Sequence, residues 1–159
     1  MPLTEIRKRL DSLSKFDLAQ EICDIINANS KFLTDLLRQQ LSTGLDADKE
    51  PVFLIRRGGE FPFYSDRTVF EKTYHGVALG KETDRITFYM TGTFYSSIYV
   101  YASGHEFIFD SAVPHYFDII SRNASGLRIM ELSKDNIEIF KREILIPQLQ
   151  AVWRLKTSV

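Results

Sequence analysis

Apolar residues recur every three or four positions through residues 18–41, and this period constrains the fold more than any other feature of the chain. A period of 3.6 residues predicts an amphipathic helix, and a single apolar stripe on so long a helix predicts that the helix lies on a sheet. The polar residues Asn27, Asn29 and Ser30 interrupt the stripe, so we expect a bend or a break there. Gly44 is expected to end the helix as a C-cap glycine. The stripe consists of Leu18, Ile22, Ile25, Ile26, Leu33, Leu36, Leu37 and Leu41.

Helical patterns also occupy both ends of the chain. Before residue 18, apolar residues at helical spacing predict a first helix, and Ser14 with Asp17 three residues later resembles a capping signal that restarts it. Near the other end, Ser133 is predicted to begin a final helix that runs to about Lys156. Pro147 lies inside this helix and should kink it, because proline has no N–H to donate.

The middle of the chain is predicted to form a β-hairpin. Residues 98–102 and 106–110 are rich in aromatic and β-branched residues, and Ser103-Gly104-His105 between them predicts a tight turn. Large apolar residues occupy both parities of these strands, so we expect both faces to be covered, by helices or by a neighbouring subunit. Residues 85–90 are also β-rich, and we expect them to contribute to the sheet.

Residues 44–92 otherwise look irregular, with one short helix predicted from about Asp66 to Thr73 after a capping Ser65. Long irregular segments within a compact domain are often functional, so the partner-binding surface is expected here. The prediction is one α+β domain over residues 1–159. Its N-terminal and C-terminal helices pack on a small antiparallel β-sheet with a long irregular insert. The parts are a helical N-terminal part (1–43), the insert (44–92), the β-hairpin (93–112) and C-terminal helices (113–159).

Composition narrows the classes of partner. The chain has 159 residues, 44% of them hydrophobic, with 20 Lys and Arg against 21 Asp and Glu. A net charge of -1 provides no general attraction for nucleic acid or for an anionic membrane. The single cysteine, Cys23, cannot form an intramolecular disulfide, and no run of 18 apolar residues is present. We therefore expect a soluble protein made in the cytoplasm, with no membrane contact and no sequence-specific nucleic-acid binding.

Motifs that would carry chemistry are incomplete. Residues 76–81 resemble a phosphate-binding loop, but three residues instead of four separate the glycines, and Glu82 stands where Ser or Thr would bind magnesium. Residues 46–50 resemble the start of a calcium loop, but Pro51 occupies the position that requires glycine. His75, His105 and His115 lack the spacing of a helical zinc site. The sequence therefore predicts no enzyme, no cofactor and no metal site; a small hydrolase using His105 or His115 is the weakest alternative.

Basic and aromatic residues occur together at Arg56, Arg57, Phe61 and Phe63. Such a loop could stack on and neutralise a single nucleic-acid strand. The acidic residues Glu60, Asp66 and Glu71 weaken the positive electrostatic field that would attract a nucleic acid. Aromatic residues together with arginine are also typical of protein interfaces. We therefore favour a protein partner for this loop.

Several short motifs occur in a recognisable order. They are Leu41-Ser42-Thr43-Gly44-Leu45-Asp46-Ala47-Asp48, Tyr64-Ser65-Asp66-Arg67-Thr68 with Lys72, Met90-Thr91-Gly92-Thr93-Phe94-Tyr95-Ser96-Ser97-Ile98, Ser125-Gly126-Leu127 and Ile146-Pro147-Gln148-Leu149. In this order the chain resembles the small neck, tail-completion or virion-morphogenesis proteins of tailed bacteriophages, especially those of Bacteroidetes phages and prophages. In that family the motifs read G-x-D-x-x-G, Y-S-x-x-T and D-T-G-x-F/L-x-x-S. Here Lys49 replaces the second glycine of the first motif, and Met90 replaces the acidic residue of the third.

The resemblance implies an α+β fold and a non-enzymatic role in joining the head connector to the tail or in finishing the tail tube, as a subunit of a homo-oligomeric ring. The implied partners are portal, adaptor or tail-tube proteins, and the implied location is the neck or tail of the virion. On this interpretation Thr91, Gly92, Phe94 and Tyr95 fix the turn that sets the hairpin. The alternative is a soluble intracellular protein-interaction module unrelated to virions. The expected partner interface comprises Arg56, Arg57, Phe61, Phe63, Tyr64, Ser65, Gly76, Gly80 and Lys81.

Overall fold

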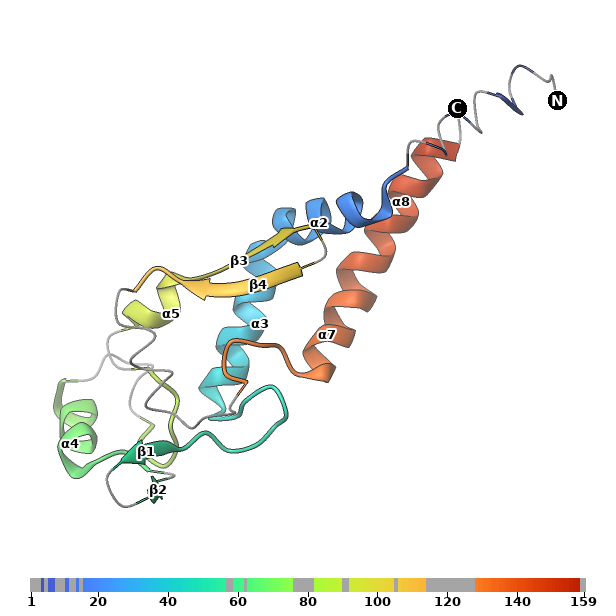
Figure 1. Cartoon of the computed structure of the whole chain (residues 1–159). Helices are drawn as coiled ribbons and strands as arrows, with labels where there is room; N and C mark the ends of the chain where they lie inside the picture. Colours follow the sequence, from blue (N-terminus) through green and yellow to red (C-terminus); the bar gives the residue numbers. More distant parts are fainter. Residues whose placement is uncertain are drawn as a thin grey trace.

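The computed structural model describes residues 4, 6, 7, 11, 14, 16–56, 59–61, 63–75, 82–89, 92–104, 106–113 and 128–157. They form an α+β fold of helices and two-stranded antiparallel sheets (Figure 1). In chain order the elements are α2 (Leu18–Ala28), α3 (Ser30–Ser42), β1 (Leu54–Arg56), β2 (Gly59–Phe61), α4 (Asp66–His75), α5 (Thr93–Ser97), β3 (Ile98–Ser103), β4 (Glu106–Ser111), α7 (Lys134–Phe140), a π-helical turn η1 (Lys141–Leu145) and α8 (Ile146–Thr157).

The predicted break in the long N-terminal helix is confirmed. Helix α2 ends at Ala28 and α3 begins at Ser30, with Asn29 between them. Asp17 caps α2 by accepting a hydrogen bond from the Gln20 N–H, whereas Ser14 donates its hydroxyl to the Asp11 carbonyl, so Asp17 alone starts this helix. Gly44 adopts a φ of 74° and donates its N–H to the Leu41 carbonyl, which ends the helical segment as expected for a glycine cap.

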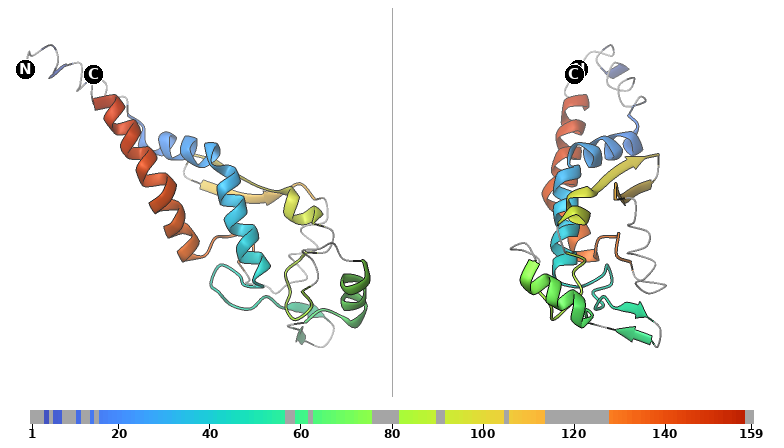
Figure 2. Two further views of the ribbon diagram at one scale, coloured as in Figure 1. Left: turned by 180° about the vertical axis from the view of Figure 1, so that it is seen from behind. Right: turned by 90° about the vertical axis from the view of Figure 1, so that its left-hand side faces the viewer.

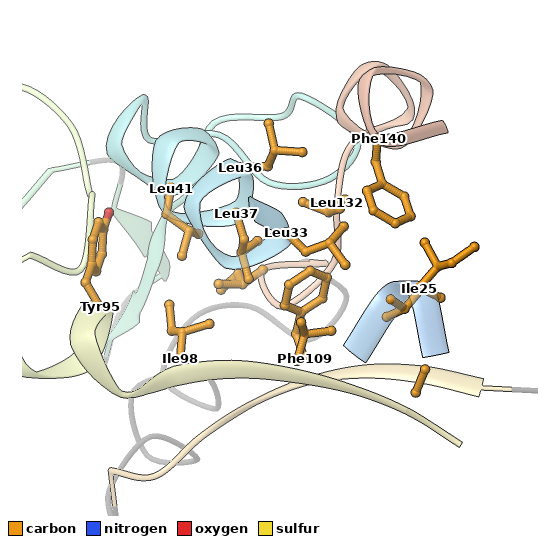
Figure 3. Packing of buried hydrophobic residues seen from close by; sticks show 14 of the residues in the cluster. Ile25, Leu33, Leu36, Leu37, Leu41, Tyr95, Ile98, Phe109, Leu132 and Phe140 are labelled. Atoms are coloured by element: carbon orange, nitrogen blue, oxygen red, sulfur yellow. The ribbon is translucent and has the colours of Figure 1, made fainter. Parts of the chain in front are cut away.

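The predicted hairpin is also confirmed. Strands β3 and β4 pair in antiparallel register from Ile98 opposite Ser111 to Ser103 opposite Glu106. Ile98, Val100, Ala102 and Phe109 are buried on one face of the hairpin, toward α2 and α3 (Figure 3). The opposite face carries large apolar side chains that are about two-fifths exposed, so the described residues do not provide the second cover that the sequence predicts. These side chains are Tyr99 (43%), Tyr101 (42%) and Ile108 (38%).

The core joins the two ends of the chain to this hairpin. Leu33, Leu37 and Leu41 of α3 are almost completely inaccessible to solvent and lie between the hairpin and the C-terminal part. Leu132 and Phe140 close the core on the far side of α3 (Figure 3). Burying this apolar surface is the main stabilising contribution to the fold.

The segment between α3 and α5 differs from prediction in two ways. Arg56, Gly59 and Glu60, which lie in the part expected to be irregular, belong to strands: β1 and β2 pair in antiparallel register from Leu54 opposite Phe61 to Arg56 opposite Gly59. Residues 85–89 form no strand, although their composition is β-rich. This part of the chain, with α4, lies at the opposite end of the molecule from α8 (Figure 2).

The C-terminal helix begins where predicted. The Ser133 hydroxyl accepts from the Asn136 N–H and caps α7. The chain then passes through the π-helical turn η1 just before Pro147 and continues as α8 to Thr157. Because proline donates no hydrogen bond and its ring crowds the preceding turn, a wider π turn at this place relieves both problems without ending the helix.

Candidate functional site

Residues from two of the short motifs, those at 64–72 and 90–98, meet around one short backbone segment, residues 86–89. Tyr64 precedes α4, Lys72 lies on α4 and Tyr95 lies on α5, yet each has a polar atom bonded to this segment. We call these three residues, with Thr87 and Tyr89, the Lys72 cluster. Residues that are far apart in the sequence therefore lie together in the fold and bind the same backbone segment.

Tyr64 explains why residues 85–89 are not a strand. Its hydroxyl oxygen accepts hydrogen bonds from the N–H groups of Thr87 (2.8 Å) and Phe88 (3.0 Å). Two consecutive N–H groups can point at one oxygen only if the backbone leaves the extended conformation, and Phe88 has a φ of 56°. The side chain thus replaces the ladder partner that a buried segment needs.

Lys72 is a fully buried lysine. Its Nζ donates to the carbonyl of Tyr89 at 2.7 Å and lies 4.6 Å from the centre of the Tyr64 ring. Burial lowers the pKa of Lys72, and the negative charge of Glu82 opposes that effect. The amine therefore acts inside the protein, where it ties α4 to the segment that leads to Gly92.

Tyr95 holds the same segment from the other side. Its hydroxyl donates to the Thr87 carbonyl at 2.6 Å, and its ring meets the Tyr89 ring edge-on at 5.1 Å. Burial raises the pKa of Tyr95, with smaller contributions from Tyr64, Glu82 and Tyr89. The phenol consequently remains a hydrogen-bond donor.

The predicted turn at residues 91–95 includes Gly92 at the N-cap of α5. Thr91 lies outside the described residues. Gly92 adopts a φ of 83°, and a Cβ atom at this position would lie 2.8 Å from the Tyr89 hydroxyl oxygen. The chain then enters α5, where Phe94 and Tyr95 are buried, and continues directly into β3. The role of this turn in setting the hairpin stays a prediction.

The first motif, residues 44–49, forms a compact turn. Asp46 is almost completely buried, and its carboxylate accepts from the N–H groups of Asp48 (2.9 Å) and Glu50 (3.0 Å). Lys49 adopts a φ of 64°. The backbone here has the conformation that favours glycine even though the side chain is lysine.

The residues predicted to form the partner interface do not share one environment. Phe63 is 59% exposed and available for contact. Tyr64 belongs to the Lys72 cluster, and Ser65 caps α4 by accepting from the Thr68 N–H at 3.2 Å. The backbones of Arg56 and Phe61 lie in β1 and β2. Arg57, Gly76, Gly80 and Lys81 lie outside the described residues, as do His105 and His115, and the interface assignment as a whole stays a prediction.

The described residues also form exposed aromatic surfaces away from the Lys72 cluster. The first is the outer face of the hairpin, where the rings of Tyr99 and Tyr101 stack at 6.2 Å and Tyr99 donates to Asp110 at 3.0 Å. This bond, the main cause, raises the pKa of Tyr99. The second surface, which the sequence analysis missed, is a groove of about 540 Å³ lined by Phe16, Leu18, Leu149, Gln150, Trp153 and Arg154.

A signal for the groove existed in the sequence. Val152, Trp153 and Leu155 make the end of the last helix apolar on more than one side, which is more than a single stripe on the core requires. Trp153 is 48% exposed and meets Phe16 edge-on at 5.5 Å. The two rings form one wall of the groove.

The part of the chain that the structure describes shows no metal site and no membrane-spanning helix. There, no three His, Cys, Asp or Glu side chains are grouped so that they could hold a metal ion. No described helix is both long enough and apolar enough to cross a membrane. The arrangement found is one of hydrogen bonds to backbone groups and of exposed aromatic surfaces, which suits binding to protein.

Comparison with known proteins adds no relative: no family model, no curated protein and no solved structure matches the chain.

Proposed function

We propose that this chain is a non-enzymatic structural protein of the bacteriophage virion, of the neck or tail-completion class. In this role it is a ring subunit that joins the head connector to the tail or finishes the tail tube. Its partners are further copies of itself and the portal, adaptor or tail-tube proteins next to the ring.

The observation that carries the proposal is the meeting of motif residues beneath an exposed aromatic hairpin. Tyr64, Lys72 and Tyr95 hold the segment that leads into Gly92, and Gly92 leads through α5 into β3. Two of the motifs that carry the phage resemblance therefore meet at the segment that precedes α5 and β3. The hairpin that begins with β3 presents Tyr99, Tyr101 and Ile108 to solvent. Large exposed aromatic patches of this kind mark contact surfaces.

The need for more than one contact surface fits a ring. A ring repeats one subunit through a head-to-tail interface, so each copy needs two different surfaces that complement each other. The hairpin face and the groove beside α8 are two such surfaces, and the aromatic residues near α4 provide a third that could meet another component of the virion. Exposed members of this third set are Phe63, Phe70 and Tyr74.

The test is mass spectrometry of purified virions from the source phage or an induced lysogen, with copy number measured against the major capsid protein. The proposal expects a few to about a dozen copies per particle, the stoichiometry of a ring. If the chain is absent from particles although the cell expresses it, the virion role is wrong. The protein would then be the intracellular interaction module that is the alternative.

A further inference from the structure

The hairpin has an outer surface that is both aromatic and acidic. We call the exposed side chains of Tyr99, Tyr101 and Ile108, with Asp110 beside them, the hairpin face. Glu106 lies at the start of β4 and is exposed as well. The strands β3 and β4 contain these two carboxylates and no lysine or arginine. A partner for the hairpin face should therefore be apolar and basic.

The groove beside α8 has the opposite character. It is lined by apolar side chains and by Arg154, and α8 contains Arg154 and Lys156 but no acidic residue. Lys156 lies over the Phe16 ring at 5.1 Å and also pairs with Glu21 of α2. Glu21 offsets the charge of Lys156, and the exposed Asp17 lies next to Phe16 and Leu18 in the sequence. The residues that line the groove itself include one cation, Arg154, and no carboxylate.

A chain cannot place its hairpin face in its own groove. The Asn27 side chain of α2 donates to the Ala102 carbonyl (3.1 Å) and accepts from the Ala102 N–H (2.8 Å). Arg38 of α3 donates to the carbonyls of Tyr95 (2.7 Å) and Ile98 (3.2 Å). These bonds hold the outer edge of β3 on the helices. Ile98, Val100 and Ala102 are buried against α2 and α3, so the hairpin face points away from them.

From these surfaces we infer that the hairpin face of one copy docks in the α8 groove of the next. The inference rests on the proposed function in that a head-to-tail contact between copies is what builds a ring. Charge selects this pairing over the symmetric ones. Two hairpin faces together would bring four carboxylates to one interface, and two grooves would bring two Arg154 side chains together, both of which are unfavourable.

The test uses two complementary charge changes in the full chain. Tyr101→Lys places a cation on the hairpin face, and Arg154→Glu places an anion in the groove; both positions are exposed, so the fold should tolerate the changes. Sedimentation velocity over a range of concentrations measures self-association. Each variant alone should associate at least tenfold more weakly than the wild type. An equal mixture of the two should recover association, because one contact is then wild type and the other pairs the introduced lysine with the introduced glutamate in reversed polarity.

A charge change away from both surfaces serves as the control. Arg67→Glu changes the net charge by the same amount on α4, where Arg67 is exposed, and should leave self-association unchanged. Circular dichroism melting of each variant checks that the fold is retained. The inference is overturned if the wild type stays monomeric, if Arg154→Glu associates like the wild type, or if the mixture recovers nothing.

These results separate the docking from the proposed function. If the chain is abundant in virions but the two variants behave like the wild type, the docking is wrong and the virion role stands. If the variants behave as expected but the chain is absent from virions, the docking stands and the virion role is wrong.

Discussion

At the scale of single residues, the hydroxyl groups of Tyr64 and Tyr95 both bind the backbone of Thr87, one as a hydrogen-bond acceptor and the other as a donor. The Tyr64 hydroxyl accepts from the Thr87 N–H, and the Tyr95 hydroxyl donates to the Thr87 carbonyl. Thr87 is buried, so both of its backbone groups need a partner. Two phenols from different elements supply these partners where a neighbouring strand would ordinarily do so.

Gly92 should be the least replaceable glycine among those that the structure describes. Gly92→Ala forces a side chain into a left-handed conformation, which costs about 1 to 2 kcal/mol, and also displaces the Tyr89 hydroxyl from a distance of 2.8 Å. Gly104→Ala is the matched control, since its φ is 64° but nothing lies within 4 Å of the new Cβ. Urea unfolding should show a larger loss of stability for Gly92→Ala, and equal losses would contradict the close contact with Tyr89.

Lys49 gives the opposite prediction. Lys49→Gly should raise the free energy of unfolding by about 0.5 to 1 kcal/mol, because glycine relieves the strain of a φ of 64°. The exposed ion pair that Lys49 makes with Asp135 at 2.5 Å contributes little and offsets only part of this gain. Glu50→Gly, one residue further on, is the control and should lower stability by a similar amount. Thermal melting of both variants measures these changes in stability. A Lys49→Gly variant that is less stable than the wild type would contradict the argument from backbone strain.

Lys72 should give the stability a pH dependence of predictable sign. Burial lowers its pKa below the usual 10.5, so the folded chain binds fewer protons here than the unfolded chain. Its contribution to stability therefore rises with pH up to that value. Lys72→Met should lower stability by about 1 to 3 kcal/mol at neutral pH because the Tyr89 carbonyl loses its donor. The deficit should widen as the pH rises from neutral toward about 10.

The Lys72 measurement needs an upper limit of pH and a control. Tyr95 has a pKa raised above its usual 10.0, so its contribution is complete below that pH and is lost above it. The urea unfolding measurements should therefore extend no higher than about pH 10. Lys31→Met, on a lysine that is 87% exposed, should keep a constant difference from the wild type over the same range. A deficit for Lys72→Met that stays constant or narrows would contradict the burial argument.

At the scale of elements, the helices protect one edge of the β-hairpin. Asn27 binds both backbone groups of Ala102, and Arg38 binds the Ile98 carbonyl, so α2 and α3 supply partners along the outer edge of β3. A bare edge is a template for unwanted pairing with other chains, and side chains from a helix are one way to cover it. The polar residues that break the long helix thus include one that completes the sheet.

Asn27→Ala tests this function of the helix. The change removes two hydrogen bonds to Ala102 and should cost about 1 to 2 kcal/mol of stability. The Ala102 amide should also exchange its hydrogen markedly faster, because its partner is lost. Gln20→Ala on the same helix, whose side chain bonds only to Asp24 among the described residues, is the control. Unchanged exchange at Ala102 would contradict the edge-covering role.

The sequence predicts those elements whose determinants are local. The period of residues 18–41, the break near Asn29, the cap at Ser133 and the hairpin around Gly104 all depend on neighbours within a few residues, and all are observed. The segment 85–89 was predicted incorrectly because its conformation depends on the hydroxyl of Tyr64, more than 20 residues away. The Lys72 cluster and the α8 groove could not be predicted for the same reason: each brings together side chains from distant parts of the chain.

At the scale of the whole molecule, the aromatic residues that are not in the core are distributed among separate regions. The hairpin packs on α2 and α3 and carries the hairpin face on its other side. Side chains of α8 line the groove. Helix α4 lies at the far end of the molecule from α8 (Figures 1 and 2). A protein with one partner needs one such region, whereas a subunit placed between two copies of itself and another component needs several. The near-zero net charge is consistent with partners that are protein.

The region near α4 should serve incorporation into the virion and not the fold. Phe63 is 59% exposed, so Phe63→Ser should change the melting temperature little. If this region contacts a neighbouring virion protein, loss of an aromatic contact residue should cost more than about 1 kcal/mol of binding, or several-fold in affinity. Quantitative mass spectrometry of particles from a complemented deletion should then find several-fold fewer copies of the variant. Arg67→Ser, at an 88% exposed position on α4, is the control and should be incorporated normally. Normal incorporation of Phe63→Ser would mean that Phe63 makes no important contact in the particle, and the predicted interface would then have to lie on other residues.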